Sequence, residues 1–171
     1  MGIRILKGGM MTTVQDLGRY GYQSQGFSVA GVMDVRSFKI ANLLLDNPEN
    51  EAVLEITLIG PTLIAITGGD FQPTINGEPA PMYTALYMNK GDVLKFGSAR
   101  TGSRGYIAFS SYLDIPVVMG SRCTNLKSGL GGFKGRKLEA DDYIGFRIKR
   151  RYLPFFLSRK LDMDEFDQTE A

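Results

Sequence analysis

Three arginines in glycine-rich stretches are the residues of this sequence best suited to chemistry. Arg19 lies in the first stretch, and Arg122 and Arg136 lie in the second. Arginine binds carboxylates and phosphates through paired hydrogen bonds, and backbone amides in glycine-rich loops add further donors. The pattern indicates a site that holds an anion. The alternative is a pair of ordinary surface loops with solvated cations, since turn-rich segments often carry no function.

The first stretch, residues 12–34, begins like a strand and then turns repeatedly. Met11, Thr13 and Gln15 alternate with the residues between them, after which glycine recurs at positions 18, 21, 26 and 31. Glycine is used where the backbone needs a positive φ or a close approach. Asp34 ends the stretch where a helical pattern begins, so it is predicted to cap that helix.

The second stretch, residues 120–136, is a long loop that concentrates glycine and positive charge. It contains Lys127 and Lys134 in addition to its two arginines. It is not a P-loop, because it lacks the Gly-Lys-Ser/Thr ending, and the Gly-x-Gly-x-x-Gly spacing fails at Lys134. Loops of this length inside a compact domain are often functional. We therefore expect the two stretches to meet on one face and to share an anionic ligand.

Composition excludes several classes of site. The chain has no histidine, which rules out Ser-His and Cys-His pairs and histidine-bound metal within it. Cys123 is the only cysteine, so no internal disulfide or cysteine zinc cluster can form, and we expect a reducing, cytoplasmic location. A net charge of +2 gives no broad attraction to nucleic acid or membranes. We predict no metal site.

The elements that must position these stretches are predicted to be mostly strands. At 171 residues the chain suits one domain or two small ones. Residues 35–46 form the one convincing helix, with Phe38, Ala41 and Leu45 on its core face. An Asn76-Gly77 pair predicts a hairpin. The strand-like runs are residues 3–6, 11–16, 53–59, 62–67, 71–75, 83–88, 93–96 and 104–109. This spacing predicts an all-β barrel or sandwich with a single helix.

Several short motifs, taken together, resemble one protein family. They are residues 13–19, 31–34, 91–97, 120–124 and 131–136. In this order they resemble the biotin-dependent carboxyltransferase family, which includes allophanate hydrolase subunit 2, the C-subunit of 5-oxoprolinase (PxpC), KipA and part of urea carboxylase. The resemblance implies that residues 1–145 are the N-terminal half of such a domain. Residues 146–171 are then expected to be a linker or tail leading to an absent second half.

The resemblance implies a fold and a reaction. The fold would be mainly β, a cyclophilin-like β-barrel with one main helix. The function would be that of one component of an ATP-dependent 5-oxoprolinase or a related carboxyltransferase or allophanate hydrolase complex. Both reactions build negative charge on a carbonyl or ureido oxygen, which fixed donors stabilise. The expected donors are Arg19, Arg122 and Arg136. The expected supporting residues are Gln15, Asp16 and Asp34, the two carboxylates orienting loops or positioning an arginine.

Partners follow from the same resemblance. We expect a KipI-like protein as the B-subunit, a lactam-utilisation protein resembling the A-subunit, and the missing second half. No cofactor is expected to be held by this chain, although ATP and biotin could act in the complex. Any biotin would come from a partner, because the chain has no Met-Lys-Met biotinylation sequence. The isolated chain is expected to be inactive. The alternative is a KipA-like regulator that binds a kinase inhibitor. Prolyl isomerase activity is disfavoured, because the chain lacks both histidine and tryptophan.

Overall fold

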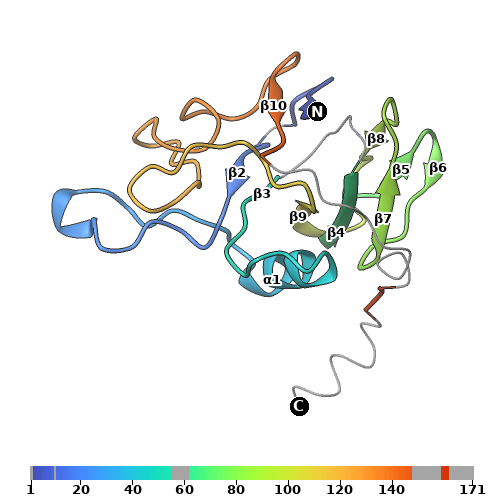
Figure 1. Ribbon diagram of the computed structural model, residues 1–171, viewed down its shortest axis with the longest axis horizontal. Coiled ribbons are helices and arrows are strands. Elements are labelled where there is room, and N and C mark those ends of the chain that lie inside the picture. The colour runs from blue at the N-terminus through green and yellow to red at the C-terminus, as the bar shows by residue number, and fades with distance from the viewer. Residues whose placement is uncertain (1, 10, 55–61, 148–158, 162–171) are drawn as a thin grey trace.

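The structure is a computed structural model that describes residues 2–9, 11–54, 62–147 and 159–161. This part of the chain is mainly β with one α-helix, as the sequence predicts (Figure 1). The helical elements are α1 (Val35–Leu44) and a 3-10 turn, η1 (Gln23–Gln25). The strands are β1 (Gly2–Arg4), β2 (Val14–Gln15), β3 (Val53–Leu54), β4 (Thr62–Asp70), β5 (Thr74–Ile75), β6 (Glu78–Pro79), β7 (Ala85–Met88), β8 (Leu94–Lys95), β9 (Thr101–Phe109) and β10 (Tyr143–Gly145).

The strands pair antiparallel in three sheets. The central sheet has the order β2-β3-β9-β4-β7, and its long strands β4 and β9 pair from Ile64 opposite Phe109 onward. A two-stranded sheet joins β1 to β10, and a three-stranded sheet has the order β6-β5-β8. Residues 159–161 extend the central sheet beside β7, since the Ala85 amide donates to the carbonyl of Arg159 at 2.9 Å. Within the described ranges these sheets do not join into one closed barrel.

The central sheet is buried on both faces. On β4, Ile64 and Ile66 face a core that includes Ile3 of β1 and Ile144 of β10. Their neighbours Leu63 and Ala65 face a second core formed with α1. A strand buried on both sides has no polar face, which explains why residues 63–66 are all apolar rather than alternating, with a buried threonine on either side of them. The prediction of a buried strand there is confirmed.

Helix α1 covers one face of this sheet and is held by the residues predicted from the sequence. The Asp34 side chain accepts a hydrogen bond from the Ser37 amide at 2.9 Å, so Asp34 is the N-cap. Phe38, Ala41 and Leu45 are fully buried against the sheet, which confirms the predicted core face. The Asp34 amide also donates to the Tyr106 hydroxyl at 2.9 Å, which fixes the start of the helix to β9.

The Asn76-Gly77 hairpin also has its predicted form. The two residues have φ angles of 54° and 94° and connect β5 to β6. Positive φ at both central positions is the geometry of the type I′ turn that Asn-Gly favours. Pro79 lies in β6 at the edge of its sheet, where a missing amide hydrogen costs no ladder bond.

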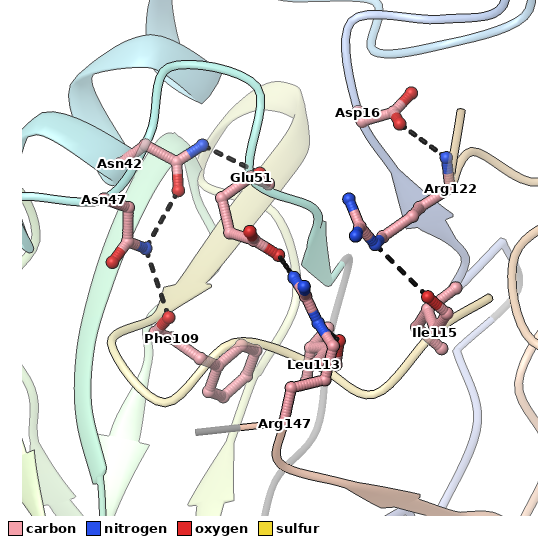
Figure 2. A network of polar contacts seen from close by, with 9 residues as sticks. All are labelled: Asp16, Asn42, Asn47, Glu51, Phe109, Leu113, Ile115, Arg122 and Arg147. Atoms are coloured by element: carbon pink, nitrogen blue, oxygen red, sulfur yellow. Dashed lines mark hydrogen bonds and ion pairs between the residues drawn. The ribbon is translucent and has the colours of Figure 1, made fainter. Parts of the chain in front are cut away.

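A polar network ties the segment after α1 to the far end of β9 (Figure 2). The buried Glu51 carboxylate pairs with Arg147, whose Nε donates to the Leu113 carbonyl at 2.9 Å. Asn42 donates to the Glu51 carbonyl at 2.9 Å, and Asn47 donates to the Phe109 carbonyl at 3.1 Å. Arg147 therefore has a structural role.

Some parts of the chain differ from the sequence expectations or lie outside the described residues. Strand β10 was not expected, because three residues carry too little pattern; its partner β1 is about 140 positions away in the sequence. Of the strand expected at residues 53–59, the structure describes only residues 53 and 54, which form β3. Of the linker or tail expected at residues 146–171, only residues 146, 147 and 159–161 are described.

Candidate functional site

The two glycine-rich stretches lie against each other, as expected from the sequence. In Figure 1 the blue loop after β2 and the yellow to orange loops before β10 gather on the side of the sheet away from β5, β6 and β8. The Thr124 amide donates to the Val14 carbonyl at 2.9 Å, and Asn125 Nδ2 donates to Ser28 Oγ at 2.9 Å. Segments about 100 residues apart in the chain therefore form one surface.

Asp16 is the residue that fastens the two stretches together. Its buried carboxylate accepts hydrogen bonds from the Gly18 amide at 2.9 Å and from Ser121 Oγ at 2.8 Å. Its other oxygen accepts from the Arg122 amide at 2.6 Å (Figure 2). All three donors are backbone or hydroxyl groups, so Asp16 orients the loops.

Arg19 is fully buried between the stretches. Its Nε donates to the Val118 carbonyl at 3.1 Å and its Nη2 to the Cys123 carbonyl at 3.3 Å. Its Nη1 is buried and has no hydrogen-bond partner within the described part of the chain. Gly131 makes room for this side chain, because a Cβ at that position would lie 2.6 Å from Arg19 Nη2.

The other two arginines are partly buried and also bind groups of the protein itself. Arg122 Nε donates to the Ile115 carbonyl at 3.2 Å (Figure 2). Arg136 binds Asp142 with both terminal nitrogens, at 2.7 and 2.8 Å. Of the two roles expected for these carboxylates, Asp16 orients the loops, and in the described part of the chain neither Asp16 nor Asp34 binds one of the three guanidinium groups. Asp34 caps α1 instead, and the holders are backbone carbonyls and Asp142.

The pair formed by Arg136 and Asp142 shifts the protonation of both groups. The hydrogen bonds from Arg136 lower the pKa of the Asp142 carboxyl below its usual value, and burial opposes this only in part. The hydrogen bond to Asp142 in turn raises the pKa of Arg136. This pair holds the end of the second stretch to the segment that leads into β10.

A pocket of about 190 Å³ opens where the two stretches meet β9. Its polar lining residues are Thr13, Gln15, Arg104, Tyr106, Thr124 and Asn125, and its apolar ones include Met11, Val32, Met33 and Leu126. Among the described residues that line it, none is one of the three predicted arginines. Of the predicted site residues, the structure brings only Gln15 into the pocket.

Gln15 has an acceptor without a partner. Its Nε2 donates to Thr13 Oγ1 at 2.9 Å and to the Thr124 carbonyl at 3.4 Å. Its Oε1 is buried and makes no hydrogen bond to any described residue. Most buried polar atoms in proteins are hydrogen-bonded, so an unpaired one in a pocket marks a position for a ligand atom or a water.

Most of the polar lining of the pocket was not predicted from the sequence, namely Arg104, Tyr106, Thr124 and Asn125. Arg104 and Tyr106 lie in β9, in a run that reads as scaffold, and only the register of β9 places them beside the first stretch. Thr124 lies within one of the motifs that carry the family resemblance, and Asn125 follows it. The motif was therefore the one available signal for these two residues.

Cys123 precedes the pocket residue Thr124, and its thiol is buried and poorly suited to act as a nucleophile. Its thiol is fully buried, and its Sγ lies 2.9 Å from Ser121 Oγ. Burial raises the pKa of the Cys123 thiol above its ordinary value. A thiol held protonated in this way is a poor nucleophile.

Metal and membrane sites find no support in the described residues. Across the described ranges, His, Cys, Asp and Glu form no group of three or more that is suited to a metal ion. No helix there combines the length and apolar character that crossing a bilayer requires.

Comparison with known proteins gives consistent matches. The sequence model of the family described as "Carboxyltransferase domain, subdomain A and B" matches residues 25–167. The C-subunit of the 5-oxoprolinase of Escherichia coli is 37% identical over 156 residues, which are 87% of this chain and 50% of that protein. The urea amidolyase of Lachancea kluyveri is 37% identical over 144 residues, which are 80% of this chain and 8% of that protein.

A solved structure agrees with these matches. The crystal structure of the K. lactis urea amidolyase superposes with a TM-score of 0.82 at 31% identity. The alignment covers 91% of this chain and 10% of that one. The chain thus spans half the length of the bacterial relative and a small part of the fungal ones.

Proposed function

We propose that this chain, which belongs to the carboxyltransferase domain family of subdomains A and B, is the N-terminal half of a 5-oxoprolinase C-subunit. In this proposal residues 1–145 supply one wall of an active site, and residues 146–171 lead to the second half. Partners resembling the A-subunit and the B-subunit would complete the assembly and bind ATP. The bacterial relative at 37% identity, of which this chain covers 50%, supports this assignment.

The observation that carries the proposal is the pocket between the two motif-bearing stretches. Residues 13–19 and 120–124 carry the family resemblance, and both contribute to the pocket wall, through Gln15 and Thr124. Scaffold strands would not need two long loops fixed by a buried carboxylate such as Asp16. The meeting of these two motif-bearing stretches at one pocket therefore supports the pocket as the functional site.

The residues around this pocket suit a reaction that builds charge on a carbonyl oxygen. Opening a lactam ring places negative charge on that oxygen, and fixed cationic or amide donors stabilise it. Arg104 lines the pocket and is the cation placed to act there. Arg19 is fully buried and does not line the pocket, so we propose that its positive charge acts from behind the wall, without a hydrogen bond to the reacting oxygen. Arg122 and Arg136 would act by holding the second stretch.

Biotin is a second group that the family resemblance suggests could bind here, since it is the carboxyl carrier of biotin-dependent carboxyltransferases. The pocket fits a ureido ring in one respect, because the unpaired Oε1 of Gln15 is an acceptor for a ring N–H. Biotin carried by a partner and carboxylated on one ureido nitrogen would supply a transferable carboxyl group. This chain's own part would be to orient that ring through Gln15 and to exclude water with the apolar side chains at the rim.

Co-purification of the tagged full-length protein from its own cells tests the proposal. We expect proteins resembling the A-subunit and the B-subunit to co-purify, and the complex to hydrolyse 5-oxoproline in an ATP-dependent reaction. The isolated chain should be inactive under the same conditions. Hydrolysis that proceeds equally without this protein would overturn the proposal. Capture of a kinase inhibitor with no hydrolysis would support the KipA-like alternative instead.

A further inference from the structure

We propose that Asn76 and Gly77 form a site of spontaneous chemical modification that the folded hairpin keeps closed. In this reaction the Gly77 amide nitrogen attacks the side-chain carbonyl carbon of Asn76, and a cyclic imide forms between the two residues. The bond from Gly77 N to Asn76 Cγ forms, the bond from Cγ to Nδ2 breaks, and the proton lost from the Gly77 amide leaves with the ammonia. Water then opens the ring at either carbonyl and leaves aspartate or isoaspartate at position 76.

The sequence and the exposure of the hairpin supply the reactants. Asn76-Gly77 is the only Asn-Gly pair in the chain, and both residues are exposed. A Cβ built on Gly77 would meet nothing within 4 Å, so neither a side chain nor a neighbour shields the attacking nitrogen. The hairpin belongs to the three-stranded sheet, which lies away from the two glycine-rich stretches (Figure 1). Water therefore has free access, and the reaction is independent of the pocket.

The turn itself holds the attacking nitrogen away from its target. Asn76 and Gly77 have φ angles of 54° and 94°, as in a type I′ turn. The first central residue of such a turn has a ψ of about 30°. At that ψ the Gly77 nitrogen lies nearly opposite the Cβ of Asn76 across the Cα–C bond, so it cannot reach Cγ. The ring closes only after ψ of Asn76 rotates, which takes the chain out of the turn.

Hydrogen bonds from the neighbouring turn hold Asn76 in this conformation. Its Nδ2 donates to Asp92 Oδ1 at 2.9 Å, and its Oδ1 accepts from the Val93 amide at 2.9 Å. Its backbone amide donates to the Val93 carbonyl at 2.9 Å. Asp92 is fixed in turn, because its Oδ2 accepts from the Asn89 amide at 2.6 Å. Ring closure moves both the backbone and the side chain of Asn76, and so breaks these bonds.

The bond to Asp92 is the strongest part of this clamp. The hydrogen bond from Asn76 lowers the pKa of the Asp92 carboxyl below its usual value, so the acceptor is a carboxylate at neutral pH. Hydrogen bonds to charged acceptors are stronger than those between neutral groups. Removing the Asp92 carboxylate should therefore open the hairpin more often and expose the site.

Modification would prevent the hairpin from returning to the clamped form. Aspartate at position 76 replaces the Nδ2 donor by a carboxylate oxygen, which would face the Asp92 carboxylate, and two carboxylates that share a site repel each other. Isoaspartate adds a methylene group to the backbone of the turn, so β5 and β6 cannot keep their pairing. Because Ile75 of β5 packs against the core that contains Ile3, the change would also loosen this sheet from the core.

Peptide mapping of the 171-residue chain measures the reaction. The chain is incubated in mildly alkaline buffer with and without urea, the products are identified by mass spectrometry, and isoaspartate is labelled with an isoaspartyl methyltransferase. We expect Asn76 to convert at least about tenfold faster in the unfolded chain, because opening the folded turn breaks at least one hydrogen bond to a charged acceptor. A peptide of residues 73–80, with and without urea, corrects for any effect of urea on the chemistry itself.

A pair of variants tests the clamp in the folded chain. Asp92→Ala removes the acceptor of Asn76 Nδ2 and should speed conversion of Asn76 by about fivefold or more. Asp114→Ala, at an exposed position outside the hairpin, is the matched control and should convert at the wild-type rate. If Asp92→Ala does not fold, the comparison of the wild-type chain with and without urea still decides.

Each outcome bears on one step of the inference. Equal rates with and without urea would overturn the claim that the fold closes the site. A wild-type rate in folded Asp92→Ala would overturn the role of the clamp. Absence of aspartate and isoaspartate at position 76 in urea would overturn the site altogether. These measurements use no partner and no substrate, so none of them decides the proposed function.

Discussion

Replacing Asp16 tests how the two glycine-rich stretches are held together. The buried carboxylate accepts hydrogen bonds from the Gly18 amide, Ser121 Oγ and the Arg122 amide, at 2.9, 2.8 and 2.6 Å. A hydrogen bond to a charged group contributes about 1.5–3 kcal/mol, but these three share one acceptor group and do not add. Asp16→Ala leaves two backbone amides buried without a partner. We expect it to lower the free energy of unfolding by about 3–5 kcal/mol.

Asp16→Asn separates the effect of shape from that of the acceptors. Asparagine has one acceptor oxygen and one donor nitrogen, so in either orientation its nitrogen faces a backbone amide. The Ser121 hydroxyl can rotate to accept, which leaves one amide unpaired. The expected loss is therefore about 1–3 kcal/mol, smaller than for alanine. Asp114→Asn, at an exposed position, is the matched control and should change stability by less than about 0.5 kcal/mol.

Urea unfolding and amide hydrogen exchange together provide the assay. Unfolding gives the order wild type, then Asn, then Ala at position 16. Exchange should accelerate at the Arg122 amide in both variants, because that amide loses its charged acceptor. Wild-type stability in Asp16→Ala, with the Arg122 amide still protected from exchange, would show that the Asp16 carboxylate does not hold the two stretches together. It would mean that the stretches are held mainly by the contacts of Thr124 and Asn125.

Three further predictions concern the surroundings of the pocket. Asp142→Asn should lower stability at pH 7 by about 1.5–3 kcal/mol. The pKa of Asp142 is lowered in the folded state, so its stabilising effect is present above the ordinary carboxyl pKa near 4 and is lost as the pH falls through the folded-state pKa. The difference in urea midpoint between the wild type and Asp142→Asn should therefore close below about pH 4. A difference that stays constant with pH would contradict the ion pair between Asp142 and Arg136. The buried Cys123 thiol should react with a thiol reagent at pH 8 only after unfolding in urea, and rapid labelling of the native chain would contradict its burial. Gly131→Ala should destabilise the chain more than Gly129→Ala. Both glycines have φ between 60° and 69°, but a Cβ at Gly131 would meet the Cys123 carbonyl oxygen and Arg19 Nη2, and one at Gly129 would meet nothing within 4 Å. Equal thermal midpoints would contradict this close packing.

The parts of the fold that follow from local sequence could be predicted. The Asp34 cap, the core face of α1 and the Asn76-Gly77 turn each depend on residues within a few positions of one another. The buried strand β4 was evident from its apolar run. In contrast, the pairing of β1 with β10 joins residues at opposite ends of the described chain, and no local pattern specifies such a partner.

The candidate site could be predicted only in outline. Glycine and charge marked the two stretches, and these do converge. The partners of the arginines could not be predicted, because a sequence does not say which acceptor a long side chain reaches. Arg136 takes the carboxylate six positions away, while Arg19 takes carbonyls 99 and 104 positions away. The pocket itself needs Arg104 and Tyr106, which only the folding of β9 beside the first stretch supplies.

We propose that the pocket between the two stretches is part of the active site. Measuring 5-oxoproline turnover by the assembled complex tests this proposal directly. The measurement compares kcat/KM at saturating ATP for the wild type, Gln15→Met and, as the matched control at an exposed position outside the pocket lining, Gln25→Met. We expect a loss of about tenfold or more for Gln15→Met and no more than about twofold for Gln25→Met. Equal turnover by the three complexes would contradict the claim and place the chemistry elsewhere in the assembly.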